Sequence, residues 1–83
     1  MNPEIRELEH LLETLVRIIS KETQTLDLYR HACVAPSTDL GRLLCQQLGD
    51  DAEAHLTKLH AARDVVQKRL DELRHGKGDT AEG

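Results

Sequence analysis

The chain has 83 residues, with 11 Lys and Arg against 15 Asp and Glu, so its formal net charge is −4. This length allows one small domain. Lys and Arg do not cluster in any segment, which excludes nucleic acid as the main partner because phosphate binding needs gathered cations. One Tyr is the only aromatic residue, and Leu, Glu, Ala, Arg and Gln dominate in place of strand-favouring runs. We therefore predict an all-α chain.

The sequence shows no sign of export or membrane insertion. Its first residues, MNPE, do not resemble a signal peptide, and no apolar run approaches the ~20 residues that a membrane span requires. We expect a cytoplasmic protein without a membrane partner. Cys33 and Cys45 are then expected to be buried thiols, although both fall near the predicted turn and a disulfide between them stays an alternative.

The first predicted helix runs from about residue 3 to about residue 35. Asn2 is a capping residue, Pro3 suits the first helical position, and Pro36 ends the helix. Apolar residues recur in alternating steps of three and four, which is typical of a helix that packs along one seam. Glu22 is the one carboxylate in that seam, which consists of Ile5, Leu8, Leu12, Leu15, Ile19, Glu22, Leu26, Tyr29 and Cys33.

Ser37, Thr38 and Asp39 supply the turn and a cap for the second predicted helix. This helix runs from about residue 38 to about residue 75, where Gly76 stops it. The two helices form one domain, residues 1–75, and residues 76–83 are expected to be a disordered tail. A second seam follows a similar spacing, and its one titratable imidazole is His55. Its members are Cys45, Leu48, Ala52, His55, Leu59, Ala62, Val66, Leu70 and Leu73.

The two seams match as an antiparallel hairpin. Facing residues then have numbers with a constant sum: Ile19 with Leu59 and Leu12 with Val66 each give 78, and Glu22 with His55 gives 77. The pattern predicts that Glu22 and His55 meet in one buried layer. The first helix begins with acidic residues and the second ends with basic ones, so long-range charge favours the same pairing.

Apolar residues beside the seams give each helix more apolar surface than one partner helix covers. We therefore predict that two hairpins associate as a homodimer, forming a four-helix bundle. Assembly beyond a dimer stays open. The residues that widen the apolar stripe are Leu11, Ile18, Leu43, Leu44, Leu56 and Val65.

Dimerisation would place two copies of Glu22 and two of His55 around one bundle axis. Carboxylate and imidazole ligands mounted on rigid helices suit iron, manganese or zinc. Asp51 precedes His55 by four residues on the same face and is the candidate for an additional ligand. The alternative is a buried Glu22–His55 pair that binds no metal and fixes the register, as single polar seam residues do in coiled coils.

Two stretches resemble the ferritin and rubrerythrin superfamily. Residues 21–30, KETQTLDLYR, resemble its first ligand helix, in which a metal-binding Glu precedes an aromatic-Tyr pair by about two turns. Residues 48–56, LGDDAEAHL, resemble the following helix, where the family has Glu-x-x-His. The similarity covers about residues 15–60, one half of the usual four-helix unit. In this respect the chain is similar to the two-helix members of the superfamily, the encapsulated ferritins. Residues 35–39 are similar to the link between the two helices of those proteins.

The resemblance implies that Glu22 and His55 bind iron between subunits, with ferroxidase activity where the site is dinuclear. Ala52 stands at the Glu of Glu-x-x-His, so a dimer supplies two Glu and two His. Asp51 as a substitute ligand, a single metal, or none all stay open, and so does catalysis. The sequence has no short apolar tail of the kind that addresses proteins to an encapsulin shell. The alternative function is a non-catalytic helical-hairpin dimer that acts as a structural or partner-binding module.

Overall fold

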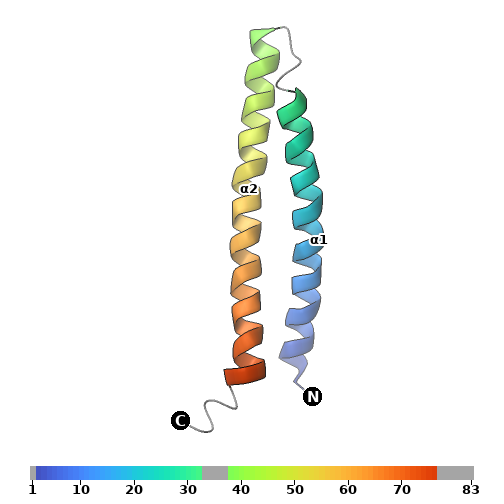
Figure 1. The fold of residues 1–83 in the computed structure, drawn as a ribbon, viewed down its shortest axis with the longest axis vertical. Helices are drawn as coiled ribbons and strands as arrows, with labels where there is room; N and C mark the ends of the chain where they lie inside the picture. The colour runs from blue at the N-terminus through green and yellow to red at the C-terminus, as the bar shows by residue number, and fades with distance from the viewer. Residues whose placement is uncertain (1, 33–37, 77–83) are drawn as a thin grey trace.

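The computed structural model describes residues 2–32 and 38–76, which form an antiparallel helical hairpin (Figure 1). Helix α1 spans Pro3–Ala32 and helix α2 spans Asp39–Asp71, followed by a π-helical turn, η1, at Glu72–Gly76. The described residues contain no strand. The predicted all-α fold and the antiparallel pairing of two helices are therefore confirmed. No helix in this part of the chain is long and apolar enough to cross a membrane.

Both helices begin at the capping residues that the sequence indicates. The side-chain oxygen of Asn2 accepts a hydrogen bond from the Glu4 amide at 2.8 Å, and α1 starts at Pro3. The Thr38 hydroxyl accepts one from the Gly41 amide at 3.0 Å. Each bond satisfies an amide that has no partner inside its helix, which fixes where the helix starts.

The helix ends differ in part from the prediction. Helix α1 extends to Ala32, and Cys33, the other half of the proposed disulfide, lies outside the described residues. Cys45 is half-buried. The α-helical geometry of α2 stops at Asp71, earlier than predicted, because the last turn widens into η1. Gly76 closes this turn without a positive φ, and the expected tail beyond it also lies outside the description.

The seam of α1 is confirmed. Leu15 and Ile19 are buried, and the other seam residues of α1 are half-buried, Glu22 among them. They form one continuous stripe because steps of three and four residues keep to one face of a helix.

The predicted seam of α2 is wrong at three of its nine positions. Leu48, His55 and Ala62 are exposed, whereas the residue that follows each of them faces α1. The predicted and observed seams share the other six positions. They differ in whether the step from Cys45, Ala52 and Leu59 is three or four residues. The steps of four prevail, because they bury Leu56, which we expected beside the seam. The seam of α2 consists of Cys45, Gly49, Ala52, Leu56, Leu59, Arg63, Val66, Leu70 and Leu73.

The best-packed core lies toward the ends of the chain. Leu15, Val66 and Leu70 form a buried cluster, and Leu70 has no exposed surface. Full burial of such a side chain stabilises the fold by about 1.5–3 kcal/mol. The half-buried residues packed on the cluster are Ile5, Leu8, Leu12 and Leu59.

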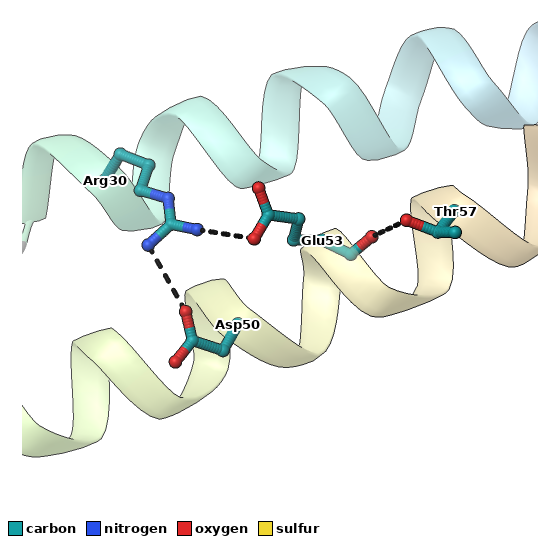
Figure 2. A network of polar contacts seen from close by, with 4 residues as sticks. All are labelled: Arg30, Asp50, Glu53 and Thr57. Carbon is teal, nitrogen blue, oxygen red and sulfur yellow. Dashed lines mark hydrogen bonds and ion pairs between the residues drawn. The ribbon is translucent and has the colours of Figure 1, made fainter.

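Ion pairs between the helices agree with the predicted pairing of an acidic start with a basic end. Arg69 contacts Glu4 at 3.1 Å, and Arg74 contacts Glu9. Near the turn, Arg30 reaches from α1 to two carboxylates of α2, Asp50 at 3.5 Å and Glu53 at 3.3 Å (Figure 2). All of these side chains are well exposed, so each pair contributes little to stability.

Candidate functional site

Glu22 on α1 and His55 on α2 lie in contact across the hairpin. His55 Nδ1 is 3.3 Å from Glu22 Oε2, within hydrogen-bonding distance. His55 is also the central residue of α2, with 55 − 39 = 16 residues before it and 71 − 55 = 16 after it. The structure thus brings together the two side chains that the seam pattern paired, at mid-height of the hairpin.

The prediction that this pair is buried is wrong for the single chain. The Glu22 side chain is 29% exposed and the His55 side chain is 54% exposed. No polar or charged residue in residues 2–32 and 38–76 is buried. The reason is the corrected seam, because Leu56 occupies the interior position and His55 lies beside it on the flank of α2. Water therefore reaches both groups, and the pair carries little of the desolvation cost of a buried ion pair.

Asp51 and Ala52 fix how many donors one chain supplies. Asp51 lies one turn before His55 and is exposed, and it makes no hydrogen bond or ion pair among the described residues. Ala52 is buried on the seam, where it offers no oxygen. No three His, Cys, Asp or Glu side chains gather at one point in the part of the chain that the structure describes. One hairpin therefore presents one carboxylate and one imidazole together.

The other acids near this layer are engaged elsewhere. Arg30 lies between Asp50 and Glu53, and Thr57 donates to the backbone carbonyl of Glu53 at 3.1 Å (Figure 2). Glu53 precedes His55 by two residues, which places the two side chains on opposite sides of α2. The sequence analysis did not find the network. The signal was present, because Arg30 with Glu53 sums to 83, close to the sum that pairs facing residues.

Seven residues make about two helical turns, so residues seven apart follow one edge of a helix. On one side of the hairpin, the ion pair of Glu4 with Arg69 joins one such series of α1 to one of α2. On the other side, two ion pairs join a second series of α1 to a second series of α2. These are Glu9 with Arg74 and Arg30 with Glu53. The first side, the His55 edge, consists of Glu4, Leu11, Ile18 and Thr25 with Leu48, His55, Ala62 and Arg69. The second, the Arg30 edge, consists of Glu9, Val16, Thr23 and Arg30 with Glu53, His60, Gln67 and Arg74.

The two edges differ in chemistry. Ion pairs close the Arg30 edge near both ends of the hairpin. On the His55 edge, among residues 2–32 and 38–76, an Arg–carboxylate pair closes only the end beside the termini, and exposed apolar side chains such as Leu11 and Leu48 follow. The next row outward on the α2 side holds Leu44 and Val65, also exposed. The Glu22–His55 pair therefore opens onto the middle of an uncovered apolar edge.

Comparisons with protein-family models, curated proteins and solved structures find no match to this chain. The donor set must therefore be judged on its own chemistry. One carboxylate and one imidazole from each of two copies make four donors, which fits a single borderline cation in a four-coordinate site. Di-iron bundles use four carboxylates and two histidines, with two of the carboxylates in Glu-x-x-His motifs, and Ala52 replaces the Glu of that motif here. A dinuclear centre does not fit these residues.

Proposed function

We propose that this chain is a ferritin-like metal-binding subunit, in which Glu22 and His55 from two copies hold one divalent cation. The observation that carries the proposal is the 3.3 Å contact of His55 Nδ1 with Glu22 Oε2 at the middle of an uncovered apolar edge. The resemblance to the ferritin superfamily favours iron. Manganese and zinc are alternatives with the same preference for carboxylate and imidazole donors.

Glu22 and His55 would have different roles in holding the cation. Glu22 supplies a negative oxygen, and His55 supplies a neutral nitrogen from the opposite helix, so the cation joins the helices and the copies. A bound cation would provide a positive charge that holds the two carboxylates together, while the apolar side chains around the pair exclude water. Asp51 lies one turn from His55 and would supply a further carboxylate oxygen only as an additional ligand beside Glu22 and His55. We propose no oxidation step, because the donors do not fit a dinuclear site.

A second candidate is a non-catalytic structural module in which the Glu22–His55 pair acts without a metal. The direct hydrogen bond between the two side chains favours it. In this function the pair fixes the register of α1 against α2, as a polar seam residue does in a coiled coil. The hairpin then serves as an assembly or partner-binding unit through its apolar edge.

Metal titration separates the two candidates. The chain, stripped with EDTA, is dialysed against Fe²⁺ without oxygen, or against Mn²⁺ or Zn²⁺, and its metal content is measured by mass spectrometry. We expect about one metal per two chains, since two copies supply the four donors of one site. Glu22→Gln and His55→Gln are expected to reduce this to a small fraction. His60→Gln on the Arg30 edge is the control and should leave the content unchanged.

The metal proposal fails if wild-type protein and both site variants hold equal, substoichiometric amounts of all three metals. In that case a lower unfolding midpoint for Glu22→Gln, measured in EDTA, would support the structural module.

A further inference from the structure

On the exposed flank of α2, positions at nearly equal distances before and after His55 hold residues that suit each other, apolar with apolar and acidic with basic. Along the His55 edge, Leu48 lies seven residues before His55 and Ala62 seven residues after it. The next row outward on α2 runs parallel to this edge, and we call it the outer row. Its members are Leu44, Asp51, Lys58 and Val65. In the outer row 44 + 65 and 51 + 58 both equal 109, and in the inner row 48 + 62 and 55 + 55 both equal 110.

We propose that a second copy of this chain docks on the His55 edge in antiparallel orientation, with the twofold axis at His55. Leu48 then meets the partner's Ala62, and Leu44 meets the partner's Val65. Asp51 meets the partner's Lys58, and the same contacts recur on the other side of the axis, as an isologous interface requires. All of these α2 positions are exposed in the single chain, so they are free to form the contact.

Charge decides the orientation. In a parallel pair each residue of the outer row faces its own copy, so Asp51 meets Asp51 and Lys58 meets Lys58, and like charges in contact disfavour the pair. In the antiparallel pair both contacts join opposite charges, and apolar side chains still meet apolar side chains. The antiparallel arrangement therefore uses the whole stripe.

The size of the face fits a second copy. Helix α2 has 33 residues and α1 has 30. At 1.5 Å per residue and a diameter of about 10 Å, the two helices present a face of about 50 by 20 Å, or about 1,000 Å². A standard stable interface buries ~800 Å² of each partner. The Arg30 edge offers no comparable apolar row, because its ends are occupied by ion pairs.

This inference rests on the proposed function in one respect, since it takes the Glu22–His55 pair as the site that two copies share. A twofold axis at His55 brings two such pairs to one point, which gives the four donors that one chain lacks. The interface itself needs no metal. It is therefore tested in EDTA, where failure of the interface and failure of metal binding are separate results.

Charge exchange within the outer row tests the orientation. Dimer dissociation constants are measured by sedimentation in EDTA for wild type, Asp51→Lys, Lys58→Asp and the double variant. Each single change places like charges at both contacts, and two exposed contacts of this kind weaken the dimer about tenfold. The double variant restores opposite charges and should return to within about threefold of wild type. Four equal constants, or a double variant weaker than both singles, would overturn the proposal.

Disulfide trapping gives an answer that does not depend on stability. In a Cys33→Ser, Cys45→Ser background, chains with Leu48→Cys are mixed with chains carrying Ala62→Cys and oxidised in EDTA. We expect the mixed 48–62 product to dominate. Like-with-like products in each separate sample would indicate a parallel pair and overturn the proposal. Val16→Asp on the Arg30 edge should leave the dimer intact, whereas Leu48→Asp should abolish it.

Discussion

The Glu22–His55 layer divides the hairpin into two halves that are packed differently. The half toward the chain ends contains the buried cluster of Leu15, Val66 and Leu70 and is bordered by ion pairs on both edges. The half toward the turn has small residues, Gly49 and Ala52, on the α2 seam. Many of its large apolar side chains are exposed, and these are Leu28, Leu40, Leu43, Leu44 and Leu48.

This difference shows that the two halves obtain their stability from different sources. Large side chains between α1 and α2 stabilise the terminal half within one chain. The turn half exposes much of its apolar surface, and a monomeric protein rarely leaves such surface contiguous and uncovered. Its leucines surround α2 on several sides, so one neighbouring helix does not cover them all. The turn half is therefore the part whose stability depends most on a second copy.

The largest expected effect is in the terminal half. Leu70→Ala removes the side chain with no exposed surface and leaves a cavity at the centre of the cluster, which should cost about 2–5 kcal/mol. Leu40→Ala in the turn half removes an exposed side chain and should change stability by less than about 0.5 kcal/mol. Urea unfolding followed by circular dichroism at one fixed chain concentration measures both. Similar losses for the two variants would contradict the contrast between the halves.

A change of the opposite sign is expected at Gly49. A Cβ added there meets its nearest atoms, Arg30 Nη1 and Tyr29 Cβ, at 3.5 and 3.6 Å, which are ordinary contact distances. Gly49→Ala should therefore fit and stabilise the turn half by about 0.4–1 kcal/mol, because alanine lowers the entropy lost when the helix forms. The urea midpoint reports this gain. Amide exchange near the turn should slow more than exchange near Leu70, and a lower midpoint would mean that the helices approach more closely than the structure shows.

The smallest expected effect is at the ion pair of Arg69 with Glu4. The hydrogen bond to Glu4 and its charge hold the pKa of Arg69 above its usual range. A raised pKa gives stability that is lost only as pH rises through it, and both folded and unfolded values lie far above neutral pH. Stability from this group should thus be constant between pH 6 and 9. Arg69→Gln should lower the urea midpoint only slightly, because an exposed ion pair contributes little to stability.

Salt identifies the cause of that small loss. At about 1 M NaCl the Debye length falls to ~3 Å, so the difference between Arg69→Gln and wild type should shrink. Lys68→Gln, one position earlier on the exposed face, is the matched control and should have no measurable effect in either salt. A loss of stability in Arg69→Gln as large as that in Leu70→Ala would contradict this expectation, because the exposed pair would then matter as much as the core.

The sequence predicted the hairpin well because its signals were redundant. The α1 seam, the caps at Asn2 and Thr38, and the charges at the chain ends all indicated the same antiparallel pairing. Hydrophobicity did not decide the α2 seam, because a step of three from Cys45 reaches Leu48, whereas a step of four from Ala52 reaches Leu56. Gly49 and Arg63 were unattractive as seam residues, although a small residue permits close approach and an arginine stem packs along apolar surface.

The candidate site was predicted in its contact and not in its burial. The constant sum paired Glu22 with His55 because it depends only on height along the hairpin. Burial depends on the angle around the helix, and an error of one residue turns a side chain by about 100°. That error moved His55 from the interior to the flank. Because of the same error, the predicted seam did not assign residues to the two edges. The ion pairs between the helices assign them, because they show which heptad series of α1 lies beside which series of α2.

The hairpin brings Pro3 and Gly76 to the same end of the rod (Figure 1). A label or fused protein attached at either terminus would leave from that end, and the turn would remain accessible at the other. In two copies packed side by side in antiparallel orientation, such attachments would lie about 50 Å apart, at opposite ends of the dimer. In copies arranged side by side in the same direction they would crowd together. Energy transfer between two terminal dyes would therefore report whether the two copies are antiparallel or parallel.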